Sequence, residues 1–445
     1  MKWTYHTGNS SMRTSTEMHL HHVGKRRGRM SEWVAIALIF SLVSVFWKSG
    51  RIVLSTGNLL PVSLLLAGGI FVALFPAFLS LERDFSLRLP RALVWALLTF
   101  MSYFLADMLQ GTVLEKELHY LKLLALLFWA FVLYNLLQQA NLEKVIRAFV
   151  LLGVIVTVVG LAKYFLLQAH FYLNLFEEDI RGRNASAHAL MIWTVTLLPY
   201  VFRKTSLFSI WTDRFFLFIF FTSLLLTLSR GALIAAVIPA IWLALSSLHL
   251  KNNRCLLSIL LITLLIGTAV WVSARILPEI VERFAPQTIF TLASMTTEGE
   301  FVSNATRLSL AKIGVRMVIE QPWGFGLASF PKYFLHYLRP GDYLPPNRDL
   351  IFSPHVQYLD VAVQGGILAL FLFVLFLGVF VRFSVSVFRN LHSASTLEIA
   401  ITLLWVAHLV YFLFSWPLER MMFWTIVAMS LAVVRQYNRK DWAYL

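Results

Sequence analysis

Cysteine and charged residues are scarce in this sequence. The chain has one cysteine, Cys255, among 445 residues, which excludes an intramolecular disulfide and any metal cluster built on cysteine ligands. Only 14% of the residues are Asp, Glu, Lys or Arg, whereas 58% are hydrophobic. A chain of this length cannot fold as a water-soluble protein with so few charges and so much apolar surface to bury. The composition therefore indicates an integral membrane protein.

Apolar runs long enough to cross a bilayer recur along the chain. A helix needs roughly 17–25 residues to cross about 30 Å of hydrocarbon. Twelve runs of about this length are present, with ends defined to within several residues, at 32–48, 58–80, 91–110, 121–139, 145–168, 186–203, 214–228, 231–249, 255–274, 358–382, 396–415 and 417–435. The sequence therefore predicts an all-α, polytopic integral membrane protein with about 12 transmembrane helices.

The predicted helices divide the chain into five regions. A basic, disordered tail is predicted over 1–31, helices one to nine over 32–274, and helices ten to twelve over 358–435, followed by a second tail at 436–445. The four histidines of the first tail leave a metal-binding role open beside that of a solvated tail. The long hydrophilic insertion 275–357 is too small for an independent domain with a large core. We expect a loop there that contains one amphipathic helix.

Lys and Arg collect in the cytoplasmic loops of membrane proteins, and here they gather at alternate ends of the predicted helices. They are Lys25, Arg26, Arg27, Arg29, Arg83, Arg88, Arg91, Lys144, Arg147, Arg203, Lys204, Arg214, Lys251, Arg254, Arg382, Arg389, Arg435, Arg439 and Lys440. This alternation predicts that both termini are cytoplasmic and that the loop 275–357 lies on the opposite, outer side. The formal net charge of +15 is then an orientation signal and an attraction to anionic membrane lipids. Nucleic acid is not an expected partner.

The stretch LSRGAL places Arg230 at the outer end of the predicted helix 231–249. The bias of cytoplasmic loops toward basic residues does not explain an arginine on the outer side. A side chain that reaches back to lipid phosphate is one explanation. The other is an anion-binding site at the membrane surface, because guanidinium carries a permanent charge and forked donors that match phosphate oxygens. Gly231 would then leave room for a bulky headgroup.

Inside the long loop, NATRLSLAKIGVRMVIEQP predicts a helix that begins near Asn304 or Thr306 and ends at Pro322. This helix has one apolar stripe, formed by Leu308, Val315, Val318 and Ile319. We therefore expect the helix to lie on the membrane surface. Arg307 falls in the first turn, where unpaired backbone N–H groups and the helix dipole favour a bound anion. An exposed loop arginine without a ligand is the alternative.

Two further outer cations, Arg181 and Arg183, occur in the stretch EEDIRGRNASAH. They add to the predicted anion site, or they pair with the acidic side chains just before them. The sequence near the outer arginines has no Asp-x-Asp motif and no carboxylate cluster. Neither a metal ion nor another cofactor is therefore expected, and the arginines would supply the positive charge.

Two motifs follow the loop helix. PWGFGLASF is a turn in which Gly324 and Gly326 are expected to bring the backbone close to another segment. In SPHVQYLDVAVQGG, His355 stands just before the predicted helix 358–382, on the outer side. A histidine with its ordinary pKa can exchange a proton near neutral pH, so His355 is a candidate base for a hydroxyl nucleophile. A structural role is the alternative.

Over roughly residues 180–380, the order of these motifs resembles the O-antigen ligase and polymerase superfamily. Its members have a small residue and an arginine at a helix start, an arginine early in the loop helix, a Pro-x-Gly-x-Gly turn followed by Phe, and a histidine before Leu and nearby glycines. The matching residues here are Arg230, Arg307, Pro322, Gly324, Gly326, Phe330, His355, Leu359, Gly365 and Gly366. In two departures, Val356 replaces the usual Asn after the histidine, and RGRNASAHAL replaces the usual Gly and Pro-Asn elements near the sixth helix.

The resemblance implies a membrane-embedded glycosyltransferase of lipopolysaccharide biosynthesis. Such enzymes transfer a glycan from an undecaprenyl pyrophosphate carrier to an acceptor hydroxyl, on the periplasmic side of the bacterial inner membrane. The resemblance also implies that the outer arginines bind the pyrophosphate, that the turn glycines position the loop, and that His355 assists the acceptor hydroxyl.

Three hypotheses for the activity and one for a purely structural role follow. A ligase, whose acceptor is a sugar of the lipid A core, is preferred over a polymerase, whose acceptor is a sugar on another carrier-linked repeat. A transporter of anionic or glycan substrates predicts polar residues along several helices, but the apolar spans carry few, with Lys163 and Asp107 as exceptions near helix ends. A membrane scaffold would leave the outer arginines unexplained.

Overall fold

The computed structural model describes residues 32–37, 51–53, 59–61, 88–138, 140–167, 180–203, 205–227, 229–249, 304–342, 353–415 and 417–442. These residues are mostly helical, apart from connecting turns and one short antiparallel pair, β1 (Arg51–Val53) and β2 (Leu59–Pro61). The first residues of the predicted helix 58–80 form β2 instead of a helix, and the remainder of that predicted span, 62–80, lies outside the described residues. The predicted helix 255–274 lies outside the described residues.

Nine long helices of the described part each coincide with a predicted span. They are α4 (Arg91–Gln110), α5 (Glu117–Leu137), α6 (Leu142–Leu167), α7 (Ile180–Phe202), α8 (Ile210–Leu226), α9 (Arg230–His249), α15 (Gln357–Arg389), α16 (Thr396–Tyr411) and α17 (Met421–Trp442). α4 has the predicted bounds, whereas α15 continues past its predicted end at 382. The prediction of helices is confirmed for these spans.

Five of the described helical segments are long and apolar enough to cross a membrane. They are Arg91–Gln110, Glu117–Leu137, Leu142–Phe165, Asn184–Phe202 and Gln357–Arg389. Shorter apolar segments occur within α9, α16 and α17. The fold is therefore that of a helical membrane protein, and the number of twelve transmembrane helices stays a prediction.

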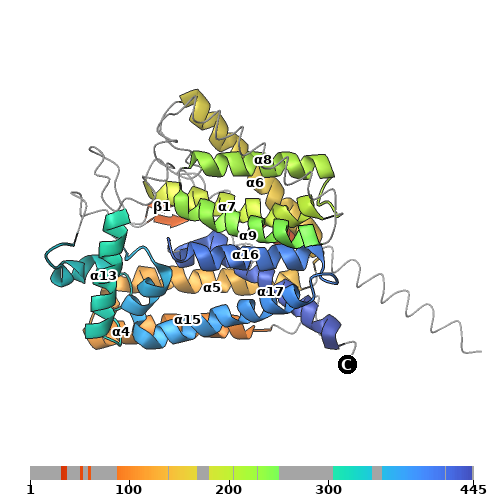
Figure 1. Ribbon diagram of the computed structural model, residues 1–445. Coiled ribbons are helices and arrows are strands. Elements are labelled where there is room, and N and C mark those ends of the chain that lie inside the picture. Colours follow the sequence, from red (N-terminus) through yellow and green to blue (C-terminus); the bar gives the residue numbers. More distant parts are fainter. Residues whose placement is uncertain are drawn as a thin grey trace, which may run out of the picture.

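The long helices pack side by side as a bundle (Figure 1). α15 lies along α4, α5 lies along α17, and α7 contacts α8, α9 and α16. Aromatic side chains fill the space between α15 and α16, where Trp405 stacks on Phe380 with ring centroids 3.7 Å apart. On the outside, α4 and α15 expose apolar side chains such as Leu105 and Phe371. Such surfaces suit contact with lipid tails, because the backbone polar groups behind them are satisfied within each helix.

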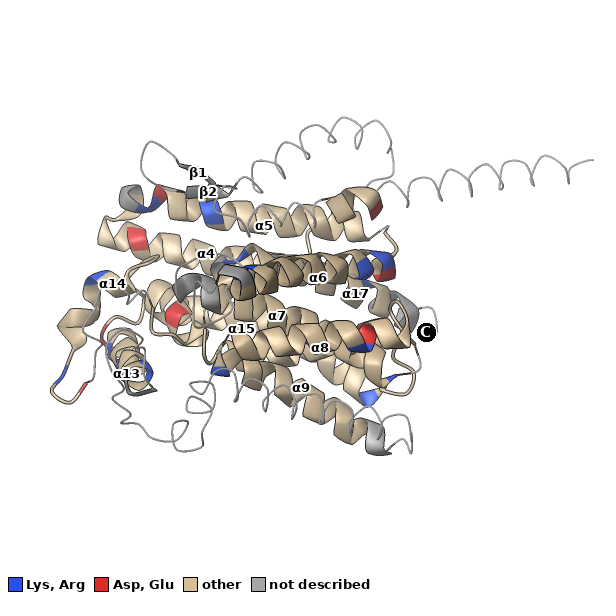
Figure 2. Ribbon diagram, turned by 90° about the horizontal axis from the view of Figure 1, so that it is seen from above, with Lys and Arg blue, Asp and Glu red and all other residues tan. Residues whose placement is uncertain are grey.

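Contacts among the helix termini group them at two ends of the bundle. At one end, Arg203 donates to the carbonyl oxygens of Leu391 and Ala394 at 2.7 and 2.6 Å. At the other end, the hydroxyl of Tyr411 donates to the carbonyl oxygen of Asn184 at 3.0 Å. The predicted alternation assigns the first group to the cytoplasmic side and the second to the outer side. The contacts agree with this grouping, and the membrane side of each end stays a prediction. Figure 2 shows that the middles of the long helices are largely free of charged residues.

A loop segment, residues 304–342, lies across one end of the bundle, the end that is predicted to be outer (Figure 1). Its main helix is α13 (Asn304–Glu320), and two short helices follow, α14 (Phe330–Tyr333) and η3 (Phe334–Tyr337). Thr306 lies inside the first turn of α13, so Asn304 is the nearer of the two predicted positions to the observed start of the helix. Two further short turns, η2 (Val113–Lys116) and η5 (Pro417–Glu419), precede α5 and α17.

α13 has two apolar faces, whereas the sequence predicted one stripe. The inner face is buried in a cluster that contains Leu310, Ile313, Met317, Phe325, Phe330, Phe334 and Val363. Of the predicted stripe, Leu308, Val315 and Ile319 are exposed, but Val318 packs against the inner cluster. An amphipathic helix at a membrane surface needs such an exposed apolar row. We therefore retain the membrane-surface placement of α13 as a proposal.

Candidate functional site

α13 lies directly against the residues that precede α15. A Cβ on Gly314 would lie 2.8 Å from Leu359 and 3.2 Å from Pro354, so a larger residue could not approach this closely without a shift. The contact brings the first turn of α13, which contains Arg307, near His355, and the Arg307 charge acts on the histidine ring. Two of the predicted site residues are thus brought together by packing.

His355 is a buried and conformationally unusual residue. Only 7% of its surface is exposed, its φ is 59°, and its N–H donates to Ser353 Oγ at 3.1 Å. Burial, and secondarily the charge of Arg307, lower the pKa of His355 to about 3. The expectation of an ordinary histidine pKa is therefore wrong. At neutral pH the imidazole is uncharged, so one ring nitrogen carries a lone pair that can accept a proton.

Arg230 is the first residue of α9 and is half-buried. The next residue, Gly231, packs against the turn that follows α16, where a Cβ on the glycine would lie 2.6 Å from Phe414 Cβ. The prediction that Gly231 leaves room for a headgroup is therefore wrong at this position, because Phe414 occupies the space. The glycine instead lets α9 approach the end of α16 closely.

The turn after α16 also reaches the start of α15. The N–H of Gln357 donates to the carbonyl oxygen of Phe412 at 2.8 Å. Phe414 of the same turn packs against the first residues of α9. Arg230 and His355 therefore lie at the same end of the bundle, and this turn links the segments that carry them.

A further arginine lies at this end and was missed by the sequence analysis. Arg420 precedes α17, and its Nη1 donates to the carbonyl oxygen of Asn184 at 2.9 Å, the same oxygen that accepts from Tyr411. Arg420 lies at a helix end that is predicted to be outer. The argument made for Arg230, that the basic bias of cytoplasmic loops does not explain an outer arginine, therefore also applied to Arg420. Arg181 and Arg183 belong to the first turn of α7, and their side chains lie outside the described residues.

The glycine turn, residues 322–328, interlocks with a kink in α15. Three backbone hydrogen bonds of 2.8 Å join them, from Phe325 N to Val363 O, from Gly326 N to Gln364 O and from Ile367 N to Pro322 O. The kink lies at Gly366, whose φ of 74° departs from helical geometry. A Cβ on Gly324 would lie 2.5 Å from Gly366 N. The expectation that the turn glycines approach another segment is confirmed: Gly324 approaches the kink of α15, and Gly326 approaches Asp107 of α4.

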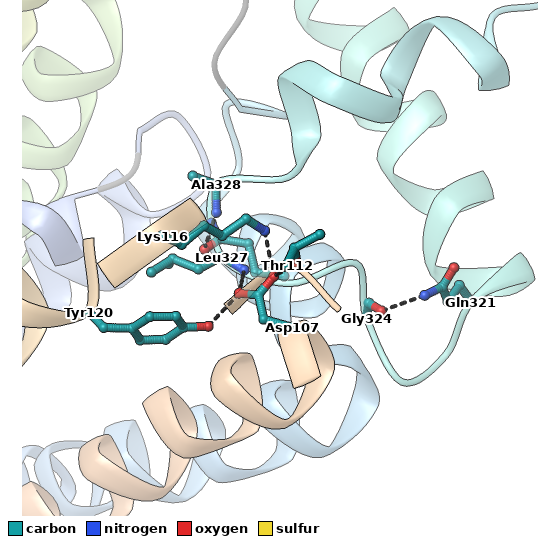
Figure 3. Close-up of polar contacts among 9 residues, drawn as sticks. Asp107, Thr112, Lys116, Tyr120, Gln321, Gly324, Leu327 and Ala328 are labelled. Atoms are coloured by element: carbon teal, nitrogen blue, oxygen red, sulfur yellow. Dashed lines mark hydrogen bonds and ion pairs between the residues drawn. The ribbon is translucent and has the colours of Figure 1, made fainter. Parts of the chain in front are cut away.

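The N–H groups of the glycine turn from Gly324 to Ala328 all donate within the protein. Besides the bonds to α15, Gly324 donates to the Gln321 carbonyl at 3.0 Å. Leu327 donates to the Asp107 carboxylate at 2.8 Å (Figure 3). Ala328 donates to the side chain of Gln364 at 3.4 Å. These N–H groups are therefore not available to a phosphate, unlike those of an anion-binding nest, and the turn has a structural role.

We expect Gly366→Ala to destabilise the protein. A Cβ at this position would overlap with the carbonyl oxygen of Pro322, and a φ of 74° is unfavourable for alanine. The backbone strain alone costs about 1–3 kcal/mol. Thermal unfolding in detergent should show a lower Tm. The matched control Gly378→Ala, on the same helix with nothing within 4 Å of a new Cβ, should keep or raise the parent Tm, because alanine is favoured over glycine inside a helix. Equal Tm values for the two variants would contradict the interlock.

Comparison with known families matches one segment of the chain. Residues 215–374 match the family model described as O-antigen ligase. The match begins in α8 and ends inside α15, so it contains Arg230, Arg307, the glycine turn and His355. A search of curated proteins finds no match to the chain.

Proposed function

We propose that this protein, whose match over residues 215–374 supports membership of the O-antigen ligase and polymerase superfamily, is an O-antigen ligase. It transfers a glycan from undecaprenyl pyrophosphate to a sugar hydroxyl of the lipid A core. The observation that carries the proposal is the packing of α13 on Pro354 and Leu359 inside the matched segment, which brings the helix turn of Arg307 toward the buried His355. The transfer needs both groups, one for the leaving pyrophosphate and one for the attacking hydroxyl.

In this proposal, Arg307 and Arg230 bind the pyrophosphate. Arg307 lies in the first turn of α13, where the helix dipole adds positive potential. The acceptor oxygen forms a bond to the anomeric carbon of the glycan, the bond from that carbon to the phosphate oxygen breaks, and the pyrophosphate leaves with the electron pair. The two guanidinium groups stabilise the negative charge that develops on it. We propose that they do so without a metal ion or other cofactor.

His355 accepts the proton of the acceptor hydroxyl. With a pKa of about 3 in the free protein, its imidazole is uncharged but weakly basic. A pyrophosphate bound at Arg307 cancels part of the positive charge that lowers this pKa. Donor binding therefore raises the basicity of His355, and the hydroxyl is activated most strongly when the donor is in place.

The other arginines of the outer end have different proposed roles. Arg181 and Arg183 lie in the first turn of α7, where the helix dipole again favours an anion, and we assign them to the donor. Arg420 donates to Asn184 O and lies 3.4 Å from the Tyr411 hydroxyl. We assign it to the contact between the start of α7 and the end of α16.

The proposal includes an orientation in the bacterial inner membrane. The outer end of the bundle, with the loop 275–357, faces the periplasm, and both termini face the cytoplasm. It rests on the alternation of Lys and Arg between the helix ends. The donor then enters from the outer leaflet, and the exposed apolar row of α13 contacts the lipid surface beside the site.

A polymerase is the second candidate function, because the matched family segment contains the motifs that ligases and polymerases share. Deletion of the gene, followed by profiling of glycolipids, distinguishes the two. We expect lipopolysaccharide without long chains and polymer that accumulates on the carrier. A lipid A core that bears a single repeat would identify a polymerase. An unchanged profile would contradict both, and complementation by the intact gene is the control.

A further inference from the structure

A buried carboxylate closes the turn between α4 and α5. Asp107, near the end of α4, has no exposed surface. Its carboxylate accepts hydrogen bonds from Thr112 Oγ1 and Lys116 Nζ, both at 2.5 Å, and from the hydroxyl of Tyr120 (Figure 3). These three donors come from the inter-helix turn and the first residues of α5. The sequence analysis noted Asp107 only as a polar exception near a helix end.

The same carboxylate also holds the glycine turn. The N–H of Leu327 donates to Asp107 Oδ2 at 2.8 Å, across the gap between α4 and the loop segment (Figure 3). A Cβ on Gly326 would overlap with the carboxylate, so only glycine allows this approach. A carboxylate has about four lone-pair sites, and four donors occupy them. Asp107 is therefore suited to holding the turn in place and not to accepting a proton from substrate.

From the glycine turn, hydrogen bonds continue into the first turns of α15. Gly326 donates to the carbonyl oxygen of Gln364 at 2.8 Å, and Ala328 donates to its side-chain oxygen at 3.4 Å. The Gln364 amide in turn donates to Asp360 Oδ2 at 2.8 Å. Asp360 lies in the first turn of α15, which begins two residues after His355. A continuous set of contacts therefore joins Asp107 to the segment that presents the histidine.

We propose that Asp107 is a positioning residue for the transfer reaction, an inference that rests on the proposed function. Asp107 holds the glycine turn, and the turn, through Gln364, holds the start of α15 with His355. These contacts fix the position of His355 relative to the turn between α4 and α5. The reacting site depends on a residue that lies well before the matched segment 215–374.

Loss of the carboxylate has two effects that must be separated. It leaves Lys116, whose side chain is only 12% exposed, without its counter-charge, and an unpaired buried charge is strongly destabilising. It also removes the acceptor of the Leu327 N–H, which releases the glycine turn. The unpaired charge of Lys116 lowers the stability of the protein, and only the release of the glycine turn tests whether Asp107 positions the site.

Two double variants separate these effects. Asp107→Asn with Lys116→Met removes both charges but keeps an amide oxygen that can accept from Leu327. Asp107→Leu with Lys116→Met removes both charges and the acceptor. With purified protein and a carrier-linked donor, we expect the first to keep turnover within about 3-fold and the second to lose about 10-fold or more, with donor affinity retained in both. Equal turnover of the two double variants would overturn the proposal.

A spin label on the glycine turn tests the same contact without the transfer reaction. Ala328 is exposed, and Cys255→Ser removes the native cysteine, so a nitroxide on Ala328→Cys reports the mobility of the turn. We expect low mobility with Asp107 intact and in the Asn double variant, and high mobility in the Leu double variant. Equal mobility in all three would overturn the proposal. The expected mobility together with no transfer by the parent protein would refute the proposed function and leave the contact supported.

Discussion

Replacement of Arg307 or Arg230 by alanine is expected to reduce glycan transfer by about 10²- to 10³-fold, which is the usual cost of removing one donor from a developing oxyanion. Donor affinity should fall together with turnover, because a charge-assisted contact to the pyrophosphate is made before the reaction starts. Both side chains are only half-buried. The variants should therefore still accumulate in the membrane.

Lysine at either position should rescue transfer poorly, because it keeps the charge but lacks the planar fork of guanidinium. The matched control is Lys312→Ala, which removes a positive charge from an exposed position on α13 and should retain donor binding and turnover. Donor affinity and single-turnover rates of the purified variants are the measurements. Near-normal transfer by the Arg230 and Arg307 alanine variants would assign both arginines to contact with lipid phosphate instead.

The second large effect is expected at His355. His355→Ala should lower turnover by about 10²- to 10⁴-fold, the range typical of general acid–base catalysis. Donor affinity should survive, because the imidazole serves the acceptor hydroxyl and not the pyrophosphate. The same assay that is used for the arginine variants checks both quantities. An unchanged rate, or a loss of donor affinity as large as that of Arg307→Ala, would leave His355 with a structural role before α15.

The pH dependence of transfer gives His355 a second readout. Imidazole must be unprotonated to act as a base, and the pKa of His355 in the free protein is about 3. The pH profile of kcat/KM, which reports the free enzyme, should therefore show no acid limb near the ordinary histidine value of about 6.5. In the donor complex the bound pyrophosphate raises this pKa, so kcat should fall with acid at a higher pH than kcat/KM does. The acid limb of kcat should be absent in His355→Ala.

The sequence by itself determined where nine of the described helices lie and which of their ends are grouped together. Apolar runs and clusters of Lys and Arg are local patterns set by the bilayer, so they can be recognised without knowledge of packing. α4 has the bounds predicted for it, and the contact of Arg203 with Leu391 and Ala394 joins two ends predicted for the same side. The candidate residues Arg230 and His355 were found for a similar reason, because a cation or a histidine at a helix start is visible in a short stretch of sequence.

The tertiary structure alone decided what these residues contact. The bond from Leu327 to Asp107 joins residues 220 positions apart, and no local pattern distinguishes this carboxylate from an ordinary polar residue near a helix end. Packing also placed Phe414 where Gly231 seemed to leave space for a ligand. The burial of His355, and secondarily the charge of Arg307, lowered the pKa of His355 far below the ordinary histidine value. Each of these contacts joins helices that are distant in sequence. Because protein interiors are close-packed, the contacts depend on how the shapes of all the helices fit together. Periodicity and charge, in contrast, indicate only where each helix begins and ends.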